Sequence, residues 1–127
     1  MSNEISGSSC GCGAKDNLIF ACSGGADVGG ITDQAARRLT LEGVGRMFCL
    51  AGIGGRVEGI LKTTKEACKI LVIDGCPINC AKKSLEQAGF ENFAHLQLAD
   101  LGMEKGMTPC VAENIIKAAE KGKEMLR

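Results

Sequence analysis

The sequence has no tryptophan, no tyrosine and only four phenylalanines among its 127 residues. Proteins that bind single-stranded nucleic acid stack the bases on aromatic side chains, and this chain is poorly supplied with them. It also lacks an excess of either charge, because 15 lysine and arginine residues balance 15 aspartate and glutamate residues. Without a basic field, we expect no binding to nucleic acid or to an anionic membrane surface.

Two further absences indicate where in the cell the protein is expected to be located. No apolar run approaches the roughly 20 residues that a membrane-spanning helix needs. The N-terminal stretch MSNEISGSSCGCG is polar, with neither the charged nor the apolar region of a signal peptide. We therefore expect a cytoplasmic protein, whose thiols stay reduced. In that compartment, the eight cysteines favour metal or redox chemistry over a disulfide framework.

The order of apolar runs predicts the fold class. Residues 1–16 are expected to be a flexible tail rich in Gly, Ser and Cys, and residues 17–127 a single α/β metal-binding domain. Four short apolar runs predict strands, within NLIFA, GRMFC, KILVID and FAHLQL. Four segments with helical spacing follow them, ITDQAARRLTLEG, RVEGILKTTKEA, PINCAKKSLEQAG and TPCVAENIIKAAEKGKEMLR.

Strands that alternate with helices form an open parallel sheet with helices on both faces. With the strands numbered along the chain, we expect the flavodoxin-like or Rossmann-like order 2-1-3-4. Finer expectations are that Thr32 caps the first helix, that Pro77 lies in the first turn of the third, and that His95 faces solvent from an edge strand.

Three cysteines recur at the same place in successive strand–helix units. Cys22, Cys49 and Cys76 are 27 residues apart (49 − 22 and 76 − 49), and each follows a predicted strand. The carboxyl ends of parallel strands share one edge of the sheet, where α/β proteins bind ligands. Cys80 adds a fourth thiol near the start of the third helix. Four thiolates suit a closed tetrahedral zinc site, so we expect zinc bound by Cys22, Cys49, Cys76 and Cys80.

The stretches CSGGADVGG, CLAGIGG and IDGCPINCAKKSLEQAG together resemble the DGC domain family, zinc-binding proteins of bacteria and archaea named after the Asp-Gly-Cys motif. The resemblance runs from about residue 18 to residue 102. It implies that the family's four chelating cysteines correspond to Cys22, Cys49, Cys76 and Cys80. The family has no assigned reaction, so the resemblance supports a metal site and says little about what the protein does.

Several alternatives remain open on the sequence. The same four cysteines suit an iron–sulfur cluster or thiol redox chemistry. A thiolate-nucleophile enzyme with a glycine-rich anion pocket would use Cys49 and Arg56, although six residues separate the pair where a phosphatase loop has five. Cys68 and Cys110 are interpreted as packing residues. The tail pair Cys10 and Cys12 is either a metal-capturing arm or a solvated terminus.

Overall fold

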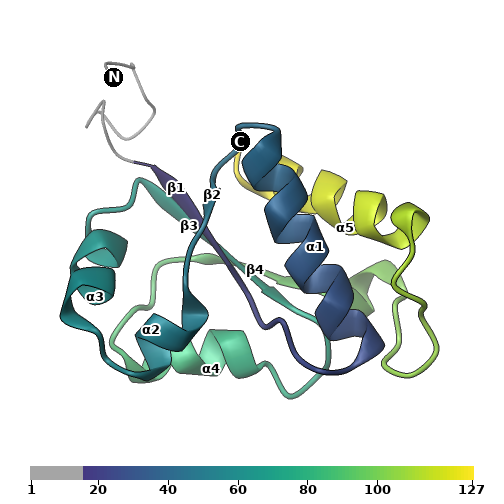
Figure 1. The fold of residues 1–127 in the computed structure, drawn as a ribbon, viewed down its shortest axis with the longest axis horizontal. Coiled ribbons are helices and arrows are strands. Elements are labelled where there is room, and N and C mark those ends of the chain that lie inside the picture. The colour runs from purple at the N-terminus through teal and green to yellow at the C-terminus, as the bar shows by residue number, and fades with distance from the viewer. Residues whose placement is uncertain (1–15) are drawn as a thin grey trace.

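The computed structural model describes residues 16–127, so the expected tail with Cys10 and Cys12 lies outside the described residues (Figure 1). A four-stranded sheet forms its centre. The strands are β1 (Asn17–Ala21), β2 (Arg46–Met47), β3 (Lys69–Asp74) and β4 (Ala94–Gln97). All pairs are parallel and the order is β2-β1-β3-β4, which confirms both the predicted fold class and the predicted order.

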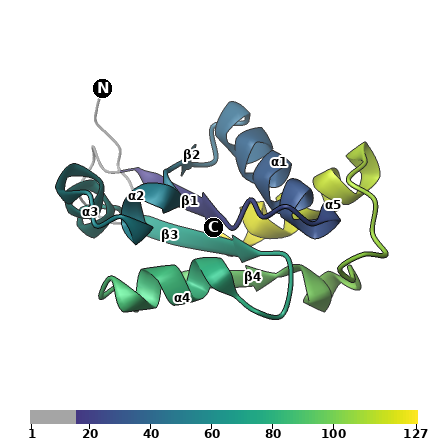
Figure 2. The ribbon, with the colours of Figure 1, turned by 60° about the horizontal axis from the view of Figure 1, so that its bottom comes forward.

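Helices cover both faces of the sheet (Figure 2). The helical segments are α1 (Asp27–Leu41), α2 (Leu50–Gly54), α3 (Glu58–Lys65), α4 (Cys80–Gln87), η1 (Leu98–Leu101) and α5 (Ala112–Met125). Side chains that alternate along β1 and β3 bury themselves on opposite faces. Ile19 and Leu71 join α1 and α5 in one apolar cluster, whereas Leu18 and Val72 join α2, α3 and α4 in the other.

The first helix begins five residues before the expected cap, at Asp27. Thr32 is fully buried within α1, and its hydroxyl donates to the Gly29 carbonyl oxygen (2.8 Å). The early start depends on close backbone approach, because a side chain on Gly29 would collide with the backbone of Gly24. Gly43 does end the helix as expected, in a left-handed conformation (φ 78°) that glycine adopts without strain.

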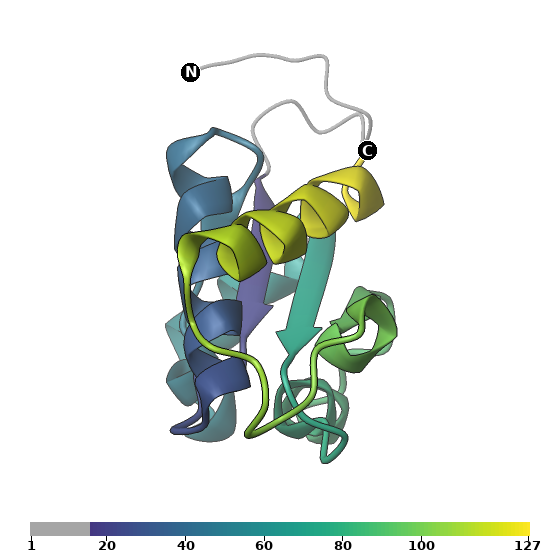
Figure 3. The same cartoon turned by 90° about the vertical axis from the view of Figure 1, so that its right-hand side faces the viewer.

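The segments preceding α4 and α5 also differ from expectation. Pro77 and Ile78 lie in a turn before α4, and Ile78 is 55% exposed. Val111 and Ile116 are exposed, whereas Ala118 and Ala119 are buried. The buried face of α5 thus consists mainly of small residues, which let the helix pack closely on α1 (Figure 3).

Among residues 16–127, no helix combines the length and the apolar character needed to cross a bilayer.

Candidate functional site

The four predicted thiols lie on segments that follow the carboxyl ends of three neighbouring strands. Cys22 directly follows β1, Cys49 follows β2 after one intervening residue, Cys76 follows β3 after one intervening residue, and Cys80 is the first residue of α4. Because β1 lies between β2 and β3, Cys22 follows the middle strand of the three. The predicted positions at one edge of the sheet are confirmed.

The Cys22 segment is held against α1 by a buried hydroxyl. The Cys22 Sγ lies 3.4 Å from the Thr32 Oγ1, and the Ser23 N–H donates to the same oxygen (3.1 Å). Ser23 adopts a left-handed conformation (φ 51°), which costs a non-glycine residue about 1 kcal/mol. The hydrogen bonds to Thr32 offset this strain and give the end of β1 a defined path.

A turn connects Cys76 to Cys80. The Asn79 N–H donates to the Cys76 carbonyl oxygen (3.2 Å), and Asn79 is left-handed (φ 58°). The Gln97 side chain, at the end of β4, donates its Nε2 to the Cys76 carbonyl oxygen (2.9 Å) and to the Asn79 Oδ1 (2.6 Å). Cys80 is exposed, and Cys76 is partly buried. A side chain of the edge strand thus fixes the turn between the two thiols.

Asp74, the acid of the Asp-Gly-Cys motif, is 1% exposed and fully bonded. Its Oδ1 accepts the Ala81 N–H (2.8 Å), and its Oδ2 accepts the Lys82 N–H (3.0 Å) and the His95 Nε2–H (2.8 Å). The carboxylate therefore binds the first turn of α4, which satisfies donors that have no partner within the helix. It orients the segment that follows Cys80.

His95 does not face solvent as expected. Its ring is 20% exposed and hydrogen-bonded to Asp74. Leu96, the next residue along β4, is buried on the opposite side. The side of β4 that carries His95 faces Asp74, whose carboxylate also binds the first turn of α4. His95 and Gln97 share this face and both hold the thiol-bearing segment, a role that their two-residue spacing could have suggested.

The thiols have different packing partners. Cys22 packs against the apolar cluster of α2, α3 and α4, while its Sγ also contacts Thr32 of α1. Cys76 packs against the cluster of α1 and α5. Within residues 16–127, no three side chains of the types His, Cys, Asp and Glu lie close enough together to hold a metal ion. The donor set suits zinc, but the described arrangement does not bring the four sulfurs together.

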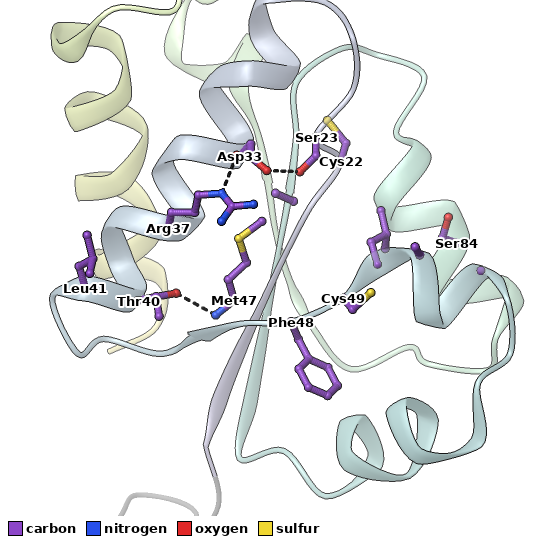
Figure 4. A pocket seen from close by; sticks show the side chains of 14 residues that line it. Cys22, Ser23, Asp33, Arg37, Thr40, Leu41, Met47, Phe48, Cys49 and Ser84 are labelled. Atoms are coloured by element: carbon purple, nitrogen blue, oxygen red, sulfur yellow. Dashed lines mark hydrogen bonds and ion pairs between the residues drawn. The ribbon is translucent and has the colours of Figure 1, made fainter.

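Two of the thiols do share a cavity of about 1150 Å³ (Figure 4). It opens between α1, the end of β1, the segment after β2, and α4. Cys22 and Cys49 line it together with mainly apolar groups. The other lining residues are Ala21, Ser23, Asp33, Arg37, Thr40, Leu41, Met47, Phe48, Leu50, Ala51, Gly54 and Ser84.

One charged pair borders this cavity. Asp33 accepts the Ser23 hydroxyl (2.8 Å) and the Arg37 Nε–H (2.8 Å). Partial burial acts to raise the pKa of Asp33, but the hydrogen bonds from Arg37 and Ser23 outweigh it and hold that pKa below its ordinary value. The hydrogen bond to Asp33 raises the pKa of Arg37. This pair was not predicted from the sequence, because opposite charges at i, i+4 spacing are common on exposed helices.

Asp27 fastens the long segment before α5 to the start of α1. Its carboxylate accepts the N–H groups of Gly106 (2.9 Å), Thr108 (3.2 Å) and Val28 (2.7 Å). These bonds, led by that from Gly106, lower the pKa of Asp27. Cys110 lies in this fastened segment, before α5 rather than in its first turn, and is exposed. The cysteine interpreted as a packing residue is thus open to solvent.

Comparison with known proteins identifies the sequence family. The model of a family described as "DGC domain" matches residues 18–122. The chain is also similar to the "Anaerobic and virulence modulator AnvM" of Pseudomonas aeruginosa, with 34% identity over 88 residues. That alignment covers 69% of this chain and 67% of the relative. No solved structure matches the chain.

Proposed function

The chain belongs to the DGC domain family, and on that premise we propose that it binds one zinc ion through the thiolates of four cysteines, Cys22, Cys49, Cys76 and Cys80. The observation that carries the proposal is their placement after β1, β2 and β3, which puts all four at one edge of a parallel sheet. Ligands of open α/β sheets bind at this edge. We also propose that the protein works in the reducing cytoplasm, where these thiols remain free.

Zinc selects such a donor set for a physical reason. Zn²⁺ takes four thiolate ligands in tetrahedral geometry, with metal–sulfur distances of about 2.3 Å. The ligands bind as thiolates, so zinc uptake releases protons and depends on pH. Redox-inert zinc would give the protein a structural, storage or transfer role.

Zinc binding requires movement, because no three potential ligands meet within the described part of the chain. Movement is least restrained where the thiols are exposed, at Cys49 and Cys80. The segment after β1 is instead hydrogen-bonded to α1 through Ser23, and its Gly24 backbone packs against Gly29. We therefore propose that the segment after β2 closes toward the other three thiols when the ion binds.

The decisive experiment is anaerobic purification followed by elemental analysis. We expect a colourless protein with about one zinc per chain. Replacing any of the four cysteines by serine should lower the zinc content, because serine is a poor zinc ligand at neutral pH. The matched control is Cys110→Ser, which removes an exposed thiol outside the proposed set and should keep the zinc.

Other outcomes would contradict the zinc site. Zinc retained at full occupancy in all four variants, or lost equally in Cys110→Ser, would exclude the proposed ligands. A brown protein with visible absorption and bound iron would favour the iron–sulfur alternative, which uses the same four cysteines.

A further inference from the structure

The cavity shared by Cys22 and Cys49 lies where the edge strand stops short. β2 has only two residues, Arg46 and Met47. Its ladder with β1 ends at the hydrogen bond from the Phe48 N–H to the Ile19 carbonyl oxygen (2.8 Å). The chain then turns away into α2. Ala21, two residues further along β1, lines the cavity.

The backbone groups of Ala21 face this opening. N–H and C=O groups of successive strand residues point to alternate sides. The Cys22 N–H donates to the Ile73 carbonyl oxygen on the β3 side (3.0 Å), so the N–H and C=O of Ala21 point to the β2 side. Within residues 16–127 they have no hydrogen-bond partner on that side. Ala21 is 2% exposed, and unpaired backbone groups that are so buried are rare in folded proteins.

A guanidinium group borders the same cavity and is oriented by one hydrogen bond, although the Arg37 side chain is 61% exposed. The Arg37 Nε is hydrogen-bonded to Asp33, which in turn accepts the hydroxyl of Ser23 (Figure 4). The two Nη groups of Arg37 have no partner among the residues that the structure describes. Paired N–H groups of this kind bind a carboxylate in a bidentate manner. Since Nε is already held, binding would immobilise less of the side chain.

The rest of the wall is largely apolar. Met47, Leu50 and Ala51 line it, and Leu41 lies at the cavity with 88% of its surface exposed. Such a wall favours an apolar side chain, which gains about 25 cal/mol for each Å² removed from water. The cavity therefore combines an open amide edge, a guanidinium and an apolar surface.

We propose that this cavity binds a small carboxylate that also carries an amide group and an apolar side chain. That is the chemistry of an N-acylated amino acid or of a peptide's carboxyl terminus. The amide pairs with the N–H and C=O of Ala21, as an added strand would. The carboxylate binds the Nη groups of Arg37, and the apolar side chain packs on Met47 and Leu50. This site goes beyond the proposed zinc function and does not require it.

The test uses N-acetyl-leucine as the probe and the ¹⁵N-labelled full chain, both as purified and after chelator treatment. We expect saturable chemical-shift changes at the Ala21 amide. The methyl ester of the probe should bind about tenfold more weakly or worse, because it cannot accept charge-assisted hydrogen bonds from Arg37. A short peptide ending in leucine distinguishes the two sources of the ligand. If the peptide binds more tightly than N-acetyl-leucine, the site is assigned to peptide carboxyl termini. If the two bind equally, it is assigned to acylated amino acids.

Two arginine variants give the matched comparison. Arg37→Gln should weaken binding of N-acetyl-leucine about tenfold or more. Arg38→Gln should leave the binding of N-acetyl-leucine unchanged. Arg38 lies on the same helix and pairs with Glu42 in a comparable way, but it is outside the cavity. The proposal is overturned if the amide of Ala21 does not respond to millimolar probe, if the ester binds as tightly as the acid, or if both variants behave alike. The ester comparison needs no variant, so it remains decisive if Arg37→Gln does not fold.

Discussion

At the scale of single residues, Asp74 does the most to position the proposed site. Its carboxylate is buried and satisfied by two backbone N–H groups of α4 and by His95. These contacts with α4 show that Asp74 orients the segment that follows the motif. The acid of the Asp-Gly-Cys motif therefore anchors the segment that carries Cys80.

Replacing Asp74 by asparagine tests this anchor. The asparagine amide keeps one acceptor but turns an NH₂ group toward backbone donors, leaving buried groups unpaired. We expect the free energy of unfolding to fall by about 1–3 kcal/mol, measured by urea denaturation. Asp100→Asn changes an exposed aspartate and should shift stability by less than about 0.5 kcal/mol. Equal effects of the two variants would contradict the anchoring role.

At the scale of elements, close backbone contacts set where the helices begin. α1 starts at Asp27 because Gly29 lets the Gly24 backbone pass against the helix. Capping rules favoured Thr32 as the start, since threonine is a common cap. The actual start depends on a contact between segments that no local rule describes. The edge strand β2 is likewise short because the chain leaves the sheet after Met47.

Two glycine substitutions separate close approach from helix propensity. Gly29→Ala should lower the free energy of unfolding by about 1–3 kcal/mol, because the new methyl group would collide with Gly24. Gly59→Ala, in α3 and facing open space, should raise it by up to about 1 kcal/mol through lower backbone entropy. Thermal or urea unfolding measures both. A stabilising effect of Gly29→Ala would contradict the packing of the β1–α1 segment.

At the scale of the whole molecule, a rigid sheet supports a less restrained edge. β3 is paired on both sides, and five of its six residues are buried. Three of the thiols instead lie on connecting segments and the fourth lies at the first residue of α4, and two of the four are exposed. Segments with few buried contacts open more readily than central strands. This contrast suits a protein that closes around an ion while its core stays unchanged.

Hydrogen exchange with and without zinc measures that closure. In the metal-free protein, we expect the slowest exchange in β3 and faster exchange in residues 22–26, 48–50 and 75–80. Zinc should slow exchange in these three segments, because ligation ties them together, and should raise the melting temperature because it binds the folded state. If bound zinc slowed exchange in only one segment, the four-cysteine site would be wrong.

The sequence by itself determined the α/β class, the parallel strand order and the placement of four thiols at one edge of the sheet. These features could be predicted because the spacing of apolar residues reports which side chains are buried, and because right-handed crossovers leave few possible orders.

Only the tertiary structure decided how the thiols relate to one another. Cys22 packs against one apolar cluster and also contacts Thr32 of α1, whereas Cys76 packs against the other cluster. The edge strand β4 supplies His95 and Gln97 to the segment between Asp74 and Cys80. The cavity beside Ala21 likewise exists because β2 ends early and α1 presents Arg37 there. Such features arise from contacts between residues far apart in the chain, and the local spacing of residue types does not specify those contacts.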